Sequence, residues 1–166
     1  MLTSALVHPL AVQTGTALQE TERMLVTAES CTGGLISAAL TDIAGSSGWF
    51  ERGFVTYSNE AKQDMLGVPA ELIERHGAVS EPVARAMAEG ALRHSRAQIA
   101  LSVTGVAGPG GGSPDKPVGT VWFGWSNGQR TVTERQQFDG DREHVRTQAA
   151  AHALRGVLAL LDRPLI

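Results

Sequence analysis

The feature that most constrains the fold is an alternation of short apolar runs with segments in which apolar residues recur at helical spacing. Residues 23–29 and 53–57 have the composition of buried strands, and a helical segment follows each of them. Residues 97–103 form a third run, too continuously apolar to face water on one side, which is typical of a central strand. Because strands separated by helices run parallel through right-handed crossovers, this alternation predicts an α/β fold.

The last part of the chain adds antiparallel pairing to this sheet. Residues 118–126 and 130–138 are predicted to form two strands joined across Asn127-Gly128, a dipeptide typical of two-residue hairpins. Helical spacing or capping residues predict helices over 4–22, 35–43, 58–67, 69–77, 80–95 and 141–161. We therefore expect a three-layer α/β/α architecture with a mixed, partly parallel sheet.

Individual residues define the ends of these helices. Ser58 or Asn59 is expected to cap the helix over 58–67, and Ser80 the helix over 80–95. Pro69 suits the first turn of the short helix that follows it. Pro9, together with Gly15, disfavours the helix over 4–22, which makes that segment the weakest of the set.

Composition excludes several classes of protein. The 166 residues suffice for one domain, 1–166, with its own core. A formal charge of −3 without a basic block argues against a nucleic-acid partner, and no apolar run approaches the roughly 20 residues of a membrane span. The single cysteine, Cys31, fits a reducing compartment, and no Cys/His pattern suggests a metal. We expect a cytoplasmic protein, homodimeric by base rate, that binds a small metabolite without metal or cofactor.

Polar residues stand where three of the expected strands end. Ser30-Cys31-Thr32 follow the first strand, Tyr57-Ser58-Asn59 the second, and Thr104-Gly105 the third. The carboxyl ends of parallel strands lie at one edge of a sheet, where open α/β sheets bind ligands. The three polar segments are therefore expected to line one cleft.

The segment ESCTGG, residues 29–34, suggests how that cleft works. A helix beginning near Thr32 would present free backbone N–H groups to an anion or a developing oxyanion, and Gly33 and Gly34 would let the ligand approach closely. Ser30 stands where α/β scaffolds expose a nucleophile, although the G-x-S-x-G pattern is absent. The alternative is that Ser30 or Thr32 only caps the helix.

A serine nucleophile needs a base, and lysine is the best candidate. The five histidines form no close pair, and His76, His94, His144 and His152 fall on expected helices or their ends. Lys62 follows Tyr57 by five residues, so both side chains can reach the same cleft. Desolvation would lower the pKa of Lys62 enough to leave it neutral. Otherwise Lys62 is a solvated surface cation.

The roles of two further side chains and of one loop have more than one interpretation. Cys31 is a competing nucleophile, since a helix N-terminus lowers a thiol pKa, or else a small packing residue. Thr104 either hydrogen-bonds a ligand or ends its strand. The glycine-rich loop 104–117 matches neither common phosphate-binding motif, so it is a lid, a backbone cradle or a plain surface loop.

Two arginines lie four residues apart on the last expected helix. Arg142 and Arg146 share one face of its first turns and can clamp a phosphate or carboxylate. Alternatively they belong to an exposed face of ion pairs with the neighbouring acidic residues Asp139, Asp141 and Glu143.

Taken together, these segments resemble the C-terminal domain of the competence/damage-inducible protein CinA, a family of nicotinamide-nucleotide amidohydrolases. The resemblance covers about residues 22–161 in the family's order, and its motifs are specific only in combination. The matching stretches are TAESCTGG (27–34), YSNEAKQDMLGV (57–68), GAVSEPVARAMAEG (77–90), TGVAGPGGG with KPVGTV (104–121) and FDGDREHVRTQAA (138–150).

The resemblance implies hydrolysis of the carboxamide of nicotinamide mononucleotide (NMN) to nicotinate mononucleotide and ammonia, in pyridine-nucleotide salvage. It implies Ser30 as nucleophile and Lys62 as base, with Tyr57 and Thr104 completing the site. Either Arg142 or Arg146 would bind the phosphate. The remaining substrate-binding candidates are Thr32, Gly33, Gly34, Asn59 and Gly105. Many CinA proteins carry a larger N-terminal domain that has no counterpart here, so the resemblance is to the stand-alone form.

Two other functions compete with this one. A regulatory module that binds the nucleotide without turnover would be stabilised by the ligand and release no ammonia. A thiol hydrolase would lose its activity in Cys31→Ala and keep it in Ser30→Ala. The serine mechanism predicts the reverse pattern for these two variants.

Overall fold

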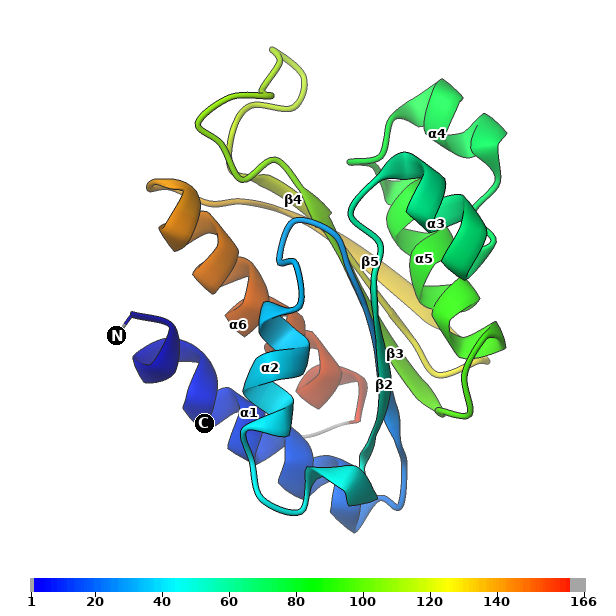
Figure 1. The fold of residues 1–166 in the computed structure, drawn as a ribbon, viewed down its shortest axis with the longest axis vertical. Helices are drawn as coiled ribbons and strands as arrows, with labels where there is room; N and C mark the ends of the chain where they lie inside the picture. Colours follow the sequence, from blue (N-terminus) through cyan, green and yellow to red (C-terminus); the bar gives the residue numbers. More distant parts are fainter. Residues whose placement is uncertain (1, 162–166) are drawn as a thin grey trace.

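The computed structural model of the chain describes residues 2–161, which form a five-stranded sheet with helices on both faces (Figure 1). The strands are β1 (Leu25–Glu29), β2 (Phe50–Val55), β3 (Ile99–Gly105), β4 (Thr120–Ser126) and β5 (Thr131–Gln137). The helices are α1 (Leu2–Glu20), α2 (Leu35–Thr41), α3 (Asn59–Leu66), α4 (Ala70–His76), α5 (Glu81–Arg93) and α6 (Arg142–Leu160), with a short 3₁₀ turn at Ser46–Gly48. None of the helices within these residues combines the length and apolar character that crossing a membrane requires.

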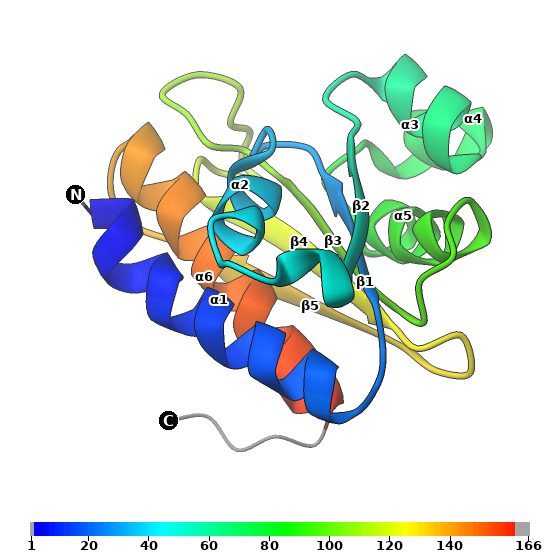
Figure 2. The ribbon, with the colours of Figure 1, turned by 60° about the horizontal axis from the view of Figure 1, so that its bottom comes forward.

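The sheet is mixed, in the strand order β2-β1-β3-β4-β5. Strand β1 pairs in parallel with both β2 and β3, whereas β3–β4 and β4–β5 pair antiparallel. Helices α1, α2 and α6 cover one face, and α3, α4 and α5 cover the other (Figures 1 and 2). The expected three-layer α/β/α fold and the central position of β3 are both confirmed.

Each face of the sheet has its own apolar core. On one side, β3 and β4 contribute Leu101 and Phe123, which belong to the same buried cluster as Leu154 of α6. On the other side, Val26 of β1 and Met87 of α5 belong to a second buried cluster. Burial of this kind contributes about 25 cal/mol per Å² of apolar surface, so both layers of helices stabilise the sheet that carries the strand ends.

Helix α1 continues through Pro9 and Gly15, the two residues that disfavour a helix here. A Cβ on Gly15 would lie 2.5 Å from the Trp49 Cζ2 atom, so only glycine allows this indole to pack on the helix. Helix α1 also lies beside α6 in both views (Figures 1 and 2), and the hydroxyls of Thr3 and Thr147 are 3.2 Å apart. Tertiary packing therefore outweighs the weak local propensity of this segment.

Several strand boundaries differ from the expectation: β1 begins at Leu25 rather than at residue 23, β3 covers Ile99–Gly105 rather than 97–103, and β4 and β5 are shorter than 118–126 and 130–138. Strand β2 runs from Phe50 to Val55 rather than over 53–57, because the carbonyls of Thr56 and Tyr57 turn away to accept hydrogen bonds from Lys62. The hairpin turn is centred on Gly128-Gln129, one position later than predicted. There the side-chain oxygen of Asn127 accepts the amides of Gln129 and Arg130, and Gly128 adopts a φ of +88°.

The caps of the helices are partly as expected. The Ser58 hydroxyl accepts the Ala61 amide at 3.0 Å and caps α3, which decides between Ser58 and Asn59. Ser80 precedes α5, but its hydroxyl donates to the Gly77 carbonyl at 2.7 Å instead of capping the helix. Pro69 lies one residue before α4 rather than inside its first turn.

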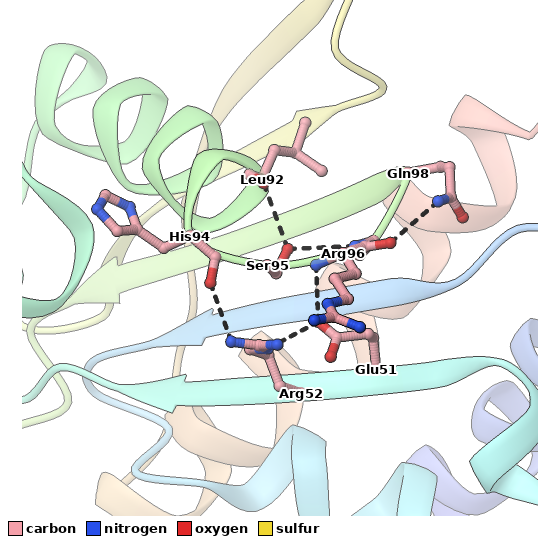
Figure 3. Close-up of polar contacts among 8 residues, drawn as sticks. Glu51, Arg52, Leu92, His94, Ser95, Arg96 and Gln98 are labelled. Atoms are coloured by element: carbon pink, nitrogen blue, oxygen red, sulfur yellow. Dashed lines mark hydrogen bonds and ion pairs between the residues drawn. The ribbon is translucent and has the colours of Figure 1, made fainter.

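The amino-terminal end of the sheet is held by a polar cluster (Figure 3). The Glu51 carboxylate accepts from Arg52 Nε at 2.7 Å and from the Arg96 amide at 3.0 Å, and Arg52 also donates to the His94 carbonyl. The hydrogen bond from Arg52 lowers the pKa of Glu51. This cluster connects edge strand β2 to the link between α5 and β3, at the end of the sheet opposite the polar strand ends.

Candidate active site

The three polar strand ends meet at one hollow, which confirms the expected convergence. It has a volume of about 230 Å³, and its lining includes residues at or just after the carboxyl ends of β1, β2 and β3. This edge of the sheet lies toward the top of Figure 1. The residues that line it are Ser30, Cys31, Tyr57, Asn59, Lys62, Ala78, Val79, Thr104, Gly105, Ala107 and Arg142.

A hydrogen bond between Lys62 and Ser30 lies in this hollow. The Lys62 Nζ atom is 2.9 Å from the Ser30 Oγ atom, although 32 residues separate them in the chain. Lys62 is only 1% exposed, and burial lowers the pKa of its ammonium group. No carboxylate within residues 2–161 forms an ion pair with it, so no opposite charge there offsets the cost of burying the ammonium group.

The backbone around Lys62 suits the neutral amine. Its Nζ atom lies 2.9 Å from the Thr56 carbonyl oxygen, 3.2 Å from that of Tyr57 and 3.5 Å from that of Ser58. A neutral amine can donate its two N–H groups to the two nearer carbonyls and turn its lone pair toward the Ser30 hydroxyl. This arrangement can accept the serine proton.

Ser30 is fixed by the central strand. Its amide donates to the Val103 carbonyl at 3.0 Å, which continues the pairing of β1 with β3 beyond the last residue of β1. Its side chain is nearly buried and is also 3.4 Å from the Tyr57 carbonyl oxygen. The hydroxyl is therefore held at the floor of the hollow and not on a free surface turn.

The turn after Ser30 corrects one expectation. Helix α2 begins at Leu35 and not near Thr32, and the amides of Gly34, Ile36 and Ser37 all donate to the carboxylate of Glu29. An internal anion thus occupies the positive end of this helix. The prediction that these amides are free for a ligand is wrong.

The same turn places Thr32, Gly33 and Gly34 away from the hollow. The Thr32 hydroxyl donates to Glu29 Oε1 at 2.7 Å. Gly33 and Gly34 have φ angles of +58° and +102°, a left-handed conformation that glycine adopts without strain. None of the three belongs to the lining of the hollow, so their predicted contact with substrate stays a prediction.

The two arginines have different places. Arg146 donates from Nε to the Cys31 carbonyl at 3.1 Å and from Nη2 to the Thr32 carbonyl at 3.0 Å. Arg142 lines the hollow, donates to the Gly108 carbonyl at 2.8 Å, and reaches the Tyr57 hydroxyl at 3.3 Å. Within residues 2–161 neither arginine forms the alternative ion pair with the acidic residues near the start of α6.

The remaining candidates form the mouth and walls of the hollow. Tyr57 is 61% exposed, so its ring and hydroxyl lie at the entrance beside Arg142 and Asn59. Thr104 is buried, and its hydroxyl donates to the Ala78 carbonyl at 3.0 Å. Gly105 packs tightly, since a Cβ there would lie 2.7 Å from Val121 Cγ2 and 3.2 Å from Cys31 Sγ.

Cys31 is a poor nucleophile in this position. Burial raises the pKa of its thiol to about 12, and the lowering by Arg146 does not compensate. A thiol of that pKa is essentially all protonated near neutral pH, and the thiolate is the reactive form. The structure therefore favours the packing interpretation of this residue.

Sequence reasoning missed two features. One is Glu29, whose only signal was a carboxylate at the end of an otherwise uncharged, buried strand. The other is a second hollow of about 440 Å³ between β5 and α6.

This second hollow is lined by Trp125, Asn127, Arg130, Val132, Glu134, His152, Arg155, Gly156, Ala159 and Leu160. None of these residues is a serine, cysteine or lysine that could act as nucleophile or base. The hollow around Ser30 is thus the candidate active site, although it is the smaller one.

No histidine lines the hollow around Ser30. His152 instead contacts Phe123 and lies 2.8 Å from the Glu134 carboxylate, in the second hollow. Among residues 2–161, no three His, Cys, Asp or Glu side chains gather as a possible metal site.

Comparisons with known proteins agree with this architecture. The model of the CinA C-terminal domain family matches residues 7–161, so the match includes most of α1 and begins earlier than the expected residue 22. The nicotinamide-nucleotide amidohydrolase PncC of Enterobacter agglomerans is 56% identical over 152 residues, which are 91% of this chain and 93% of that protein. The PncC protein of Escherichia coli strain K12 is 54% identical over 154 residues, with 92% and 93% covered.

Solved structures extend the agreement to three dimensions. The crystal structure of the competence/damage inducible protein CihA from Agrobacterium tumefaciens has a TM-score of 0.91 and 46% sequence identity to this chain. The match covers 95% of this chain and 96% of that one. By family model, sequence identity and fold alike, the chain belongs to the family of the CinA C-terminal domain.

Proposed function

We propose that this chain is a nicotinamide-nucleotide amidohydrolase, which hydrolyses the carboxamide of NMN to nicotinate mononucleotide and ammonia in pyridine-nucleotide salvage. The names of the relatives that are more than half identical support the substrate. The observation that carries the chemistry is the 2.9 Å hydrogen bond between Ser30 Oγ and the buried Lys62 Nζ. Serine with a neutral lysine is an established arrangement for acyl transfer.

The reaction begins with the transfer of the Ser30 proton to the Lys62 amine. The Ser30 oxygen attacks the carboxamide carbon and forms a tetrahedral oxyanion. Lys62 then returns the proton to the amide nitrogen, the C–N bond breaks, and ammonia leaves behind an acyl group on Ser30. A water molecule, deprotonated by the same amine, hydrolyses the ester and restores Ser30.

The oxyanion needs donors other than the start of α2. Those amides already bind Glu29, but within residues 2–161 the amide of Cys31 donates to no carbonyl or carboxylate. Cys31 directly follows the nucleophile and lines the hollow, so its amide is our candidate for the oxyanion hole. A single donor of this kind is worth about 10²–10³ in rate.

The walls of the hollow suggest how the substrate is oriented. The Thr104 hydroxyl donates a hydrogen bond to the Ala78 carbonyl. Its oxygen lone pairs are therefore left to accept a hydrogen bond from the carboxamide nitrogen of the substrate. Arg142, at the mouth, is the better candidate for the phosphate, since Arg146 already donates to Cys31 and Thr32. The exposed ring of Tyr57 offers an apolar face at the entrance.

The wider setting of the enzyme is part of the proposal. We infer that residues 1–166 work as one amidohydrolase domain, as a homodimer in the cytoplasm, on a free nucleotide and without nucleic acid, membrane, metal or cofactor. The net charge of −3 supports the absence of a nucleic-acid partner, and the free, buried Cys31 supports a reducing compartment. Light scattering tests the dimer, and activity in a chelator tests the independence from metal.

Ammonia release from NMN by the purified protein, without added metal, tests the activity. Wild type and Cys31→Ala should release ammonia, whereas Ser30→Ala should release none while keeping its circular dichroism spectrum. Thermal stabilisation by NMN without any ammonia would favour the regulatory module instead. Loss of activity in Cys31→Ala with retention in Ser30→Ala would favour the thiol hydrolase.

A further inference from the structure

Glu29 is a fully buried carboxylate that takes no part in the reaction described above. It nevertheless accepts five hydrogen bonds, all from residues 32–37. Three come from the amides of Gly34, Ile36 and Ser37, at 3.2, 3.0 and 2.9 Å. The other two come from the hydroxyls of Thr32 and Ser37, at 2.7 and 2.6 Å. Hydrogen bonds to a charged acceptor in a buried place are among the stronger ones in proteins.

The backbone of Glu29 connects both halves of the proposed catalytic pair. Its carbonyl accepts the Thr56 amide at 2.8 Å, and the Thr56 carbonyl in turn accepts from Lys62 Nζ. Ser30 is the next residue in the chain. Glu29 therefore connects the segment that holds the lysine to the turn that carries the serine.

Arg146 holds the other side of the same turn. Its guanidinium, which comes from α6, donates to the carbonyls of Cys31 and Thr32, while the Glu29 carboxylate accepts amides farther along the turn, beginning with that of Gly34. The turn is thus fixed through its carbonyls from one helix and through its amides from β1. Two charged groups of opposite sign hold a short, glycine-containing segment that would otherwise be free to move.

We propose that Glu29 is a positioning residue that fixes the Ser30 hydroxyl against Lys62, with Arg146 as its counterpart. The inference rests on the proposed function for the role of Ser30. Reacting groups must be held close to their productive geometry, and a displacement of about 1 Å can cost about 10²-fold in rate. Loss of the carboxylate should therefore slow the chemical step and leave substrate binding almost unchanged.

Glu29→Gln is the decisive variant, because it keeps the shape of the side chain and removes one of its two acceptor oxygens. We expect its kcat to fall by about 10- to 100-fold, with KM within about twofold of wild type. Glu51→Gln is the matched control, since Glu51 is also a strand carboxylate that accepts a backbone amide, but at the opposite end of the sheet (Figure 3). It should keep the wild-type kcat.

Ser37→Ala provides a second, milder test. It deletes the 2.6 Å hydroxyl donor to Glu29 and leaves no unpaired charge, so it should fold even if Glu29→Gln does not. We expect a loss of several-fold in kcat, again without a change in KM. A kcat within twofold of wild type in either folded variant would overturn the positioning role.

Labelling of Ser30 by a fluorophosphonate separates this inference from the proposed function. The reagent reports the reactivity of the serine without any nucleotide. Slower labelling of Glu29→Gln than of Glu51→Gln supports positioning even if wild type releases no ammonia from NMN, a result that would refute only the proposed function. Equal labelling rates of the two variants would contradict the positioning role.

Discussion

Lys62 makes the stability of this protein depend on pH in a way that can be measured. Burial lowers the pKa of its ammonium in the folded state below the ordinary value of 10.5. Between the folded and the unfolded pKa, the unfolded chain binds one more proton at this residue than the folded chain. The free energy of unfolding therefore rises with pH through this window, and the contribution of Lys62 levels off above the unfolded value.

Replacement of Lys62 by Met removes this dependence. One proton corresponds to a slope of about 1.4 kcal/mol per pH unit, which is the largest contribution that Lys62 can make inside the window. The variant loses the hydrogen bonds to the Thr56 and Tyr57 carbonyls, a cost of about 1–3 kcal/mol for each acceptor left unpaired. That cost does not vary with pH, so the difference in slope isolates the titration of the lysine.

Urea unfolding of wild type and Lys62→Met between pH 6 and 10 measures the two slopes. We expect the stability of wild type to rise relative to the variant as pH increases toward 10.5. Lys116→Met is the control for the loss of a lysine, because Lys116 is the other lysine of the chain and lies half-exposed beside the His76 carbonyl. Parallel curves for wild type and Lys62→Met would refute the lowered pKa and with it the neutral base.

Three further predictions follow from the walls of the hollow. Arg142→Ala should raise KM for NMN by about tenfold or more and leave KM for the phosphate-free riboside nearly unchanged; an equal effect on both substrates would remove Arg142 from the phosphate. Gly105→Ala should lower the free energy of unfolding by about 1–3 kcal/mol in denaturant titrations, because its Cβ would overlap Val121; wild-type stability would show that the packing there is loose. Iodoacetamide should alkylate folded Cys31 far more slowly at pH 8 than the unfolded chain, since its pKa is raised to about 12; equal rates would contradict its burial.

The sequence predicted the framework because its signals are local and its rules of assembly are general. Apolar runs separated by helical segments define parallel strands, and parallel strands bring their carboxyl ends to one edge. The convergence of Ser30, Lys62 and Thr104 on one hollow follows from these rules alone. The resemblance to the CinA family then added the chemistry that spacing left open.

The features that the sequence could not predict depend on side chains that form hydrogen bonds with backbone amides or carbonyls. The start of α2 appeared free for a ligand, because no local pattern shows that the Glu29 carboxylate turns onto it. Arg142 and Arg146 share a helix face, so only tertiary contacts separate the one that lines the hollow from the one that holds the turn. The hairpin moved by one residue because Asn127 accepts two backbone amides.

The most direct test compares Ser30→Ala, Lys62→Met and the double variant in single-turnover ammonia release from NMN. Groups that act as one unit lose their contribution together, so each single variant should lose about as much rate as the double variant. Independent, multiplying losses, or wild-type turnover in either single variant, would contradict the account in which the buried amine removes the proton of the Ser30 hydroxyl.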